Sequence, residues 1–149
     1  MAPAAARPCA APGHLRGALE YRLDPNSLGI SSLRLTLASD RCELRLVGAD
    51  GEHAIEMGIG SWIESEADIP APELHHGYEM SPARVVASAC WTDAATLRMT
   101  WIFVESAFRD TVTCRFEGDR IRYSREVNVN SGPLSQTALT GTAIRSVGL

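Results

Sequence analysis

The sequence predicts an all-β fold, a single antiparallel up-and-down barrel of about eight strands with little helix. Three observations predict it. Apolar and polar residues alternate with a period of two from Ala18 onward, which is typical of strands that are buried on one face. Short polar turns join successive alternating runs, as in β-hairpins. No segment keeps the i, i+3, i+4, i+7 spacing of an amphipathic helix. A barrel is favoured over a two-sheet sandwich because sequential hairpins build it without long crossovers.

Length and composition agree with one soluble-type domain. The chain has 149 residues, of which 45% are hydrophobic and 21% charged, and it carries a formal net charge of −4. The negative charge argues against a nucleic-acid partner held by phosphate contacts, and no apolar run reaches the ~20 residues of a membrane span. All 14 basic residues are arginine. The missing lysine excludes Schiff-base chemistry, a phosphate-loop lysine and Ser-x-x-Lys nucleophiles from this chain.

The N-terminal segment is predicted to be separate from the fold. Residues 1–17 are rich in Ala and Pro and are expected to form a disordered leader, with the barrel domain spanning 18–149. The segment lacks the basic start and the apolar stretch of a secretory signal. The four cysteines form no C-x-x-C pair, and Cys42 and Cys114 share strand parity with large apolar neighbours. We therefore predict buried free thiols rather than a disulfide, and a reducing cytoplasm as the setting.

The first half of the chain contains three alternating runs. Leu33, Leu35 and Leu37 alternate with polar residues, and the turn 39–41 leads into a second run with Cys42, Leu44 and Leu46 on one face. After a turn over 48–51, a third run places His53, Ile55, Met57 and Ile59 on one face. The segment 64–82 carries three prolines and no recognised strand pattern, and is predicted to be a long loop at one end of the barrel.

The second half repeats the pattern. Strands are predicted over 84–91 and 96–105, joined by the turn 92–95, and over 112–116, followed by the turn 117–119. Ile121 and Tyr123 open the next strand, and a bulge is predicted before Val127 and Val129 continue it. A weaker run spans 137–145.

Residues that could perform catalysis or bind metal are few. No Ser stands in a G-x-S-x-G motif, and the only histidine pair, His75-His76, lies in the long acidic loop. Adjacent histidines on an extended chain point to opposite faces, so they do not readily share a metal. No catalytic residue, metal or cofactor is predicted. An acid–base enzyme that uses His75 or His76 with a nearby carboxylate remains a third alternative.

The tryptophans stand out in a chain with few aromatics. Trp62, Trp91 and Trp101 either fill the barrel or line a cavity for a small ligand, since small barrels can hold one. The candidate ligand-binding set is therefore Trp62, Trp91, Trp101, His75 and His76.

The strand ending at 104 is apolar on both faces. Met99, Trp101 and Phe103 share one face, while Ile102 and Val104 lie on the other. A sheet that is wet on one side should alternate apolar with polar residues. We therefore predict that Ile102 and Val104 form an interface, covered by the long loop, a second copy of the chain or a neighbouring domain.

Several short motifs carry a family resemblance. Four motifs occur in this order: Gly58-Ile59-Gly60-Ser61-Trp62, Ala87-Ser88-Ala89-Cys90-Trp91-Thr92-Asp93, Phe108-Arg109-Asp110-Thr111-Val112 and Arg115-Phe116-Glu117-Gly118-Asp119-Arg120. The region 19–130 resembles the C-terminal β domain of serine hydrolases of the β-lactamase-related, penicillin-binding-protein-like family. The resemblance implies a lipocalin-like barrel that acts as an accessory module against a catalytic domain, with no catalytic residue of its own.

Two functions follow as hypotheses. The first is a non-catalytic accessory or interaction domain, whose partner is a hydrolase domain or a second copy of the chain. The alternative is a lipocalin-like protein that binds a small apolar ligand in a cavity lined by tryptophans. The first predicts no turnover by the isolated chain, and the second predicts that an apolar ligand changes the tryptophan fluorescence.

Overall fold

The computed structural model describes residues 17–49, 51–67, 83–104, 106, 108–128, 134–136 and 138–144. The predicted leader lies outside the described residues except for Gly17, as does most of the predicted long loop, and the division into leader and domain stays a prediction. All regular elements of the described part are strands. Within these residues there is no helix that is long and apolar enough to cross a membrane.

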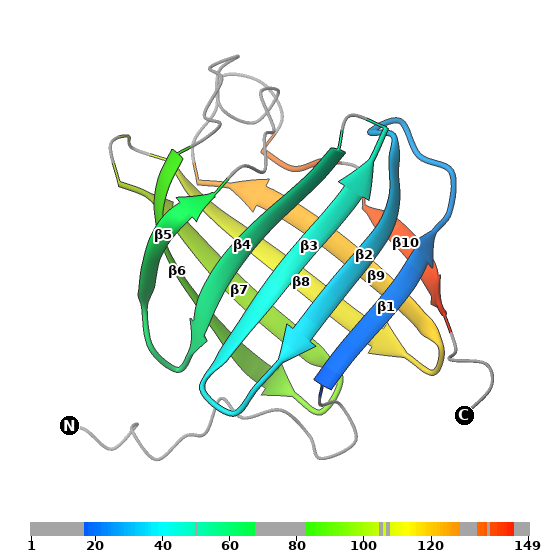
Figure 1. The fold of residues 1–149 in the computed structure, drawn as a ribbon, viewed down its shortest axis with the longest axis horizontal. Coiled ribbons are helices and arrows are strands. Elements are labelled where there is room, and N and C mark those ends of the chain that lie inside the picture. Colours follow the sequence, from blue (N-terminus) through cyan, green and yellow to red (C-terminus); the bar gives the residue numbers. More distant parts are fainter. Residues whose placement is uncertain are drawn as a thin grey trace.

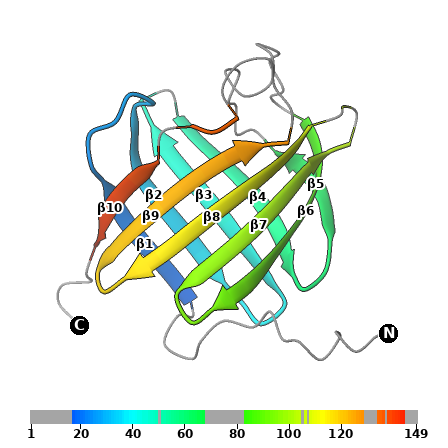
Figure 2. The same cartoon turned by 180° about the vertical axis from the view of Figure 1, so that it is seen from behind.

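Ten strands form one closed, essentially antiparallel sheet, so the predicted all-β barrel is confirmed with two more strands than expected (Figures 1 and 2). Except for β4 and β5, neighbours along the chain pair in antiparallel fashion, and β10 lies between β1 and β9 in the sheet. The strands are β1 Gly17–Leu23, β2 Ile30–Leu37, β3 Arg41–Gly48, β4 Gly51–Ile59, β5 Ile63–Ala67, β6 Ala83–Asp93, β7 Thr96–Phe103, β8 Arg109–Glu117, β9 Arg120–Val127 and β10 Leu139–Ala143.

Two local expectations are wrong. The segment Ile63–Ala67, which was included from Glu64 onward in the predicted loop, forms β5 and pairs with β6. Its glutamates alternate with residues that face inward, a strand pattern too short to recognise by period alone. The predicted bulge in β9 is also absent, because β9 pairs with β8 in unbroken register from Arg120 to Val127.

The alternating residues of each strand create the core. Inward positions along β2 and β3 are fully or almost fully buried, while the positions between them are exposed or half-buried. The layer of β1 to β4 faces the layer of β6 to β9 (Figure 1). The buried apolar side chains of both layers belong to one hydrophobic cluster. This burial is the main source of stability, at roughly 25 cal/mol per Å² of apolar surface.

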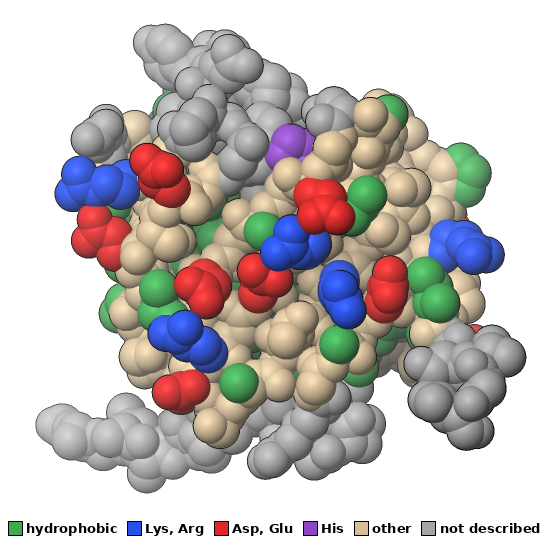
Figure 3. Space-filling model, in the orientation of Figure 1, with side chains coloured by type: hydrophobic (Ala, Val, Ile, Leu, Met, Phe, Trp, Pro, Cys, Tyr) green, Lys and Arg blue, Asp and Glu red, His purple; other side chains and the backbone are tan. Residues whose placement is uncertain are grey.

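The outer surface carries ion pairs within and between neighbouring strands. On the face of β3 and β4, Arg45 contacts Glu52 at 2.7 Å and Glu43 at 3.2 Å, and acidic and basic side chains are interspersed there (Figure 3). Asp24, at the end of β1, accepts hydrogen bonds from Arg120 at 2.8 Å and Thr140 at 2.6 Å, and the Arg120 bond is the main cause of its lowered pKa. The Asp24 contacts join β1, β9 and β10, where the first and last described strands of the chain pair with each other.

The sheet has one seam, between β4 and β5. These two strands are consecutive in the chain but stand at the two ends of the strand order, so they share no backbone ladder. Closure comes from β4 and β6, which pair in parallel through Gly58 and Ile59. Gly60 adds a hydrogen bond from its N–H to the Ala89 carbonyl at 3.0 Å.

Gly58 permits the tight turn beside this seam. A Cβ on Gly58 would lie 2.5 Å from the carbonyl oxygen of Ser61 and would also collide with the Ser61 side chain. The glycine run noted in the sequence therefore serves a close approach of the chain to itself.

Candidate functional site

A buried ion pair stands inside the barrel. Asp110 on β8 and Arg125 on β9 both point inward, with side-chain exposures of 0% and 1%, and Arg125 Nε donates to Asp110 Oδ2 at 2.7 Å. Among the described residues they are the only charged side chains that are buried in this way. Buried charges are expensive unless paired, so their presence in an apolar interior is a candidate for function.

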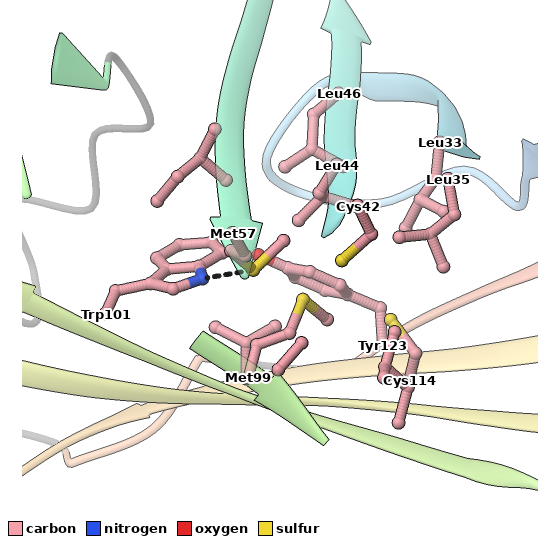
Figure 4. Close-up of a cluster of buried hydrophobic side chains, with 14 of the residues drawn as sticks. Leu33, Leu35, Cys42, Leu44, Leu46, Met57, Met99, Trp101, Cys114 and Tyr123 are labelled. Atoms are coloured by element: carbon pink, nitrogen blue, oxygen red, sulfur yellow. Dashed lines mark hydrogen bonds between the residues drawn. The ribbon is translucent and has the colours of Figure 1, made fainter. Parts of the chain in front are cut away.

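Trp101 positions the arginine. The Arg125 guanidinium carbon lies 4.9 Å from the centroid of the Trp101 ring, a cation–π contact. The indole Nε1 of Trp101 in turn donates toward Met57 Sδ at 3.3 Å, across the interior from β7 to β4 (Figure 4). The guanidinium is therefore fixed on one face by an aromatic ring and at Nε by a carboxylate.

Two hydrogen-bond donors beside this ion pair have no acceptor. The Tyr123 hydroxyl and Arg125 Nη2 are buried, and neither has a hydrogen-bond partner among the described groups. Figure 4 shows the Tyr123 ring extending across the interior toward Trp101 and Met57. Buried polar atoms are almost always satisfied by protein, water or ligand, so these two donors are available to a water molecule or to a ligand.

The protonation state of Tyr123 suits a donor. Burial raises the pKa of the Tyr123 phenol well above its ordinary value, and the charge of the neighbouring guanidinium opposes that rise only in part. The guanidinium is close enough to affect this pKa, but the two groups make no hydrogen bond of good geometry to each other. The phenol therefore stays protonated over the physiological range. We call Trp101, Asp110, Tyr123 and Arg125 the interior polar cluster.

Two of the predicted tryptophans lie inside the barrel, in different places. Trp91 and Trp101 are 6% and 0% exposed. They lie near the ends of the antiparallel strands β6 and β7, and therefore toward opposite ends of the barrel. Trp91 packs against Phe116 with ring centroids 5.6 Å apart. Only Trp101 belongs to the interior polar cluster.

Trp62 lies outside. It is 54% exposed, in the turn between β4 and β5. It borders an outer hollow of about 400 Å³ together with Ile102 and with Arg98, Thr100, Arg109 and Thr111. The structure therefore brings Trp62 together with a predicted interface residue rather than with the other tryptophans.

The predicted interface and the histidine pair have different outcomes. Ile102 is half-buried and Val104 is 39% exposed, and the proposal that they form an interface stays a prediction. His75 and His76 lie outside the described residues. Within the described ranges, no group of three His, Cys, Asp or Glu side chains is arranged to hold a metal.

Sequence reasoning missed three of the four cluster residues. Arg125 has the same parity as Ile121, Tyr123 and Val127, and Asp110 has the same parity as Val112 and Cys114. Opposite charges at inward positions of two paired strands would have predicted the ion pair. Tyr123 was read only as a strand residue, because nothing in the sequence shows that its hydroxyl lacks a partner.

The two interior cysteines are as predicted. Cys42 and Cys114 are buried and free, and Cys90 is disulfide-bonded (Figure 4 shows the two free thiols). Burial raises the pKa of the Cys42 thiol to about 12, and it also raises the pKa of Cys114. Both thiols are therefore neutral apolar fillers at neutral pH.

The Cys42 pKa predicts a loss of stability in alkali. Below about pH 9 the thiol is protonated in both states, whereas between about pH 9 and pH 12 only the unfolded state releases the proton, so stability falls as the pH rises. Urea unfolding at about pH 10.5 and pH 8 should show that wild type loses about 2 kcal/mol more than Cys42→Val does, at 1.36 kcal/mol per pKa unit. Equal losses in the two proteins would contradict the burial of this thiol.

Comparisons with known proteins identify similar folds but no sequence family. No protein-family model matches the sequence, and no curated protein matches it. Among solved structures, a fatty acid-binding protein from the brain of Drosophila melanogaster is similar with a TM-score of 0.55 and 14% identity, over 83% of this chain and 96% of that one. A Schistosoma mansoni fatty acid-binding protein in complex with arachidonic acid gives a TM-score of 0.55 and 8% identity, over 90% and 98% of the two chains. Human cRBP IV gives 0.52 and 10%, over 91% and 100%.

The resemblance to β-lactamase-related serine hydrolases is therefore wrong. The structural neighbours are fatty acid-binding barrels, and no sequence family supports the hydrolase relationship or a hydrolase partner. The motifs that suggested it lie partly at hairpin turns, where many antiparallel proteins converge. Thr92-Asp93 leads into the turn between β6 and β7, and Gly118, with φ +62°, turns the chain between β8 and β9.

Proposed function

We propose that this chain binds a small, largely apolar molecule inside its barrel. The single observation that carries the proposal is the interior polar cluster, in which the Tyr123 hydroxyl and Arg125 Nη2 are buried donors without a partner. The remaining inward surface consists mostly of Leu, Met, Val and aromatic side chains, which favour an apolar ligand body. The likeness to fatty acid-binding barrels supports the same function at the level of the fold.

The ligand would lie beside Trp101 and Met57. The indole and the guanidinium form one wall of the polar cluster, and the Met57 thioether bridges to the facing layer. Methionine adapts readily to ligands of different shape. The apolar part of the ligand would contact these groups while its polar end meets Tyr123 and Arg125.

Tryptophan quenching tests this placement. A straight-chain alcohol that carries bromine quenches only indoles that it approaches closely, so titration should reduce the fluorescence of Trp101. The Trp62→Phe variant should keep most of the quenching because Trp62 is exposed outside the barrel. The Trp101→Phe variant, which keeps an aromatic ring against Arg125, should lose most of it. If the Trp62→Phe variant loses the quenching and the Trp101→Phe variant keeps it, the ligand lies outside the barrel and the proposal is refuted.

The cytoplasm is the compartment we propose, on the ground that Cys42 and Cys114 remain free thiols. The disulfide at Cys90 argues the other way, since disulfides persist mainly in oxidising compartments. Trapping of thiols in intact cells, followed by mass spectrometry of the Cys90 peptide, decides between them. A trapped free thiol at Cys90 supports the cytoplasm.

A further inference from the structure

The charge of the interior polar cluster is already balanced. Arg125 contributes one positive charge and Asp110 one negative charge, and their side chains are joined at 2.7 Å with exposures of 1% and 0%. No other charged side chain in the described part is fully buried. The cluster therefore has no net charge to offer a ligand, although the guanidinium itself is cationic.

The two donors that remain for a ligand can be satisfied by an uncharged acceptor. Arg125 Nε donates to Asp110, and the face of the guanidinium packs on Trp101. The Nη2 atom has no hydrogen-bond partner. Tyr123 adds a protonated phenol. Both are donors that an oxygen atom of a ligand can satisfy, and neither requires the ligand to be charged.

A carboxylate ligand would be disfavoured here. It would place a second negative charge beside Asp110, and among the described residues Arg125 is the only buried cation that could compensate it. The penalty for an uncompensated buried charge exceeds the gain from one more hydrogen bond. An uncharged oxygen accepts the same bonds without that penalty.

We infer that the barrel takes an apolar ligand whose polar end is an uncharged oxygen, such as a hydroxyl, a carbonyl or an ester, and that it discriminates against the corresponding carboxylate. The inference rests on the proposed function and assigns the ligand class for that same site. The Tyr123 hydroxyl and Arg125 Nη2 hold the oxygen, and Asp110 sets the selectivity by neutralising the arginine. Asp110 is a positioning residue, because it acts through Arg125.

The experiment compares three ligands with the same hydrocarbon chain. The primary alcohol, the methyl ester and the ionised acid are titrated at about pH 8 into the intact chain, and their dissociation constants are measured by calorimetry. The alcohol and the ester should bind at least about tenfold more tightly than the acid, which corresponds to ~1.4 kcal/mol. Equal affinities, or tighter binding of the acid, would overturn the inference while leaving the proposed function intact. Binding of none of the three would refute the proposed function, and the inference with it.

Matched variants identify the residues responsible. Tyr123→Phe removes only the hydroxyl and should weaken the alcohol and ester about tenfold. Tyr21→Phe makes the same chemical change at a buried tyrosine of β1 and should leave the affinities unchanged. Asp110→Asn keeps the shape of the side chain but releases the charge of Arg125, so the preference should turn toward the acid. Should Asp110→Asn fail to fold, Tyr123→Phe still decides, because unchanged affinity in that variant would overturn the anchoring role.

Discussion

Replacement of Asp110 by alanine is expected to destabilise the barrel by about 3–5 kcal/mol, the range for removing one partner of a buried ion pair. The arginine would stay in the interior with its charge uncompensated, because its side chain is 1% exposed and Trp101 packs against its face. Urea unfolding followed by circular dichroism measures the loss. This is among the largest effects that a single substitution in this protein should produce.

A double variant separates the ion pair from simple packing. Asp110→Leu combined with Arg125→Met replaces both charges by apolar groups, and well-packed apolar replacements of buried ion pairs are often neutral or stabilising. The double variant should therefore recover most of the stability that Asp110→Ala loses. It should also lose selectivity for a polar ligand end. A cost below about 1 kcal/mol for Asp110→Ala would show that the arginine finds water, contrary to its burial.

Replacement of Gly58 by alanine should destabilise the protein by about 2–3 kcal/mol, in the upper part of the range for an overpacked site. The added methyl would lie 2.5 Å from the Ser61 carbonyl oxygen, so the backbone of the turn has to shift. Gly58 and Ile59 make the parallel contact with β6, so this shift strains the closure of the barrel. Thermal unfolding and urea unfolding both report the change.

The matched control for Gly58 is Gly29→Ala. Gly29 has φ +71° and open space around its Cβ position, so alanine there meets backbone strain but no collision. Its cost should be about 1 kcal/mol. If Gly58→Ala costs no more than Gly29→Ala, the close approach at Ser61 is not what holds the seam.

The alternation of side chains made most of the fold predictable, because a period of two is a local property. The hairpins that join β2 to β3 and β8 to β9 lie where the short polar turns predicted them. β5 was missed because it has only five residues and two of them are glutamates. The pairing of β4 with β6 is non-sequential, and no local pattern encodes it.

The candidate site was less predictable than the fold. Trp101 was recognised as a candidate from its rarity, but Trp62 has the same rarity and is 54% exposed. Nothing in the sequence singles out Arg125, since arginine is seldom buried without a partner. Its partner Asp110 lies fifteen residues away in the chain, and only the register of β8 with β9 brings them together.

The missing ladder between β4 and β5 has a mechanical consequence. The backbone hydrogen bonds of β4 run to β3, apart from the short pairing with β6 at Gly58 and Ile59, and those of β5 run to β6. Moving β4 and β5 apart on the N-terminal side of Gly58 would widen the interior without breaking a backbone hydrogen bond between strands. Backbone hydrogen bonding is therefore continuous around most of the circumference of the barrel and interrupted along one line, where separation of the strands costs no ladder bond.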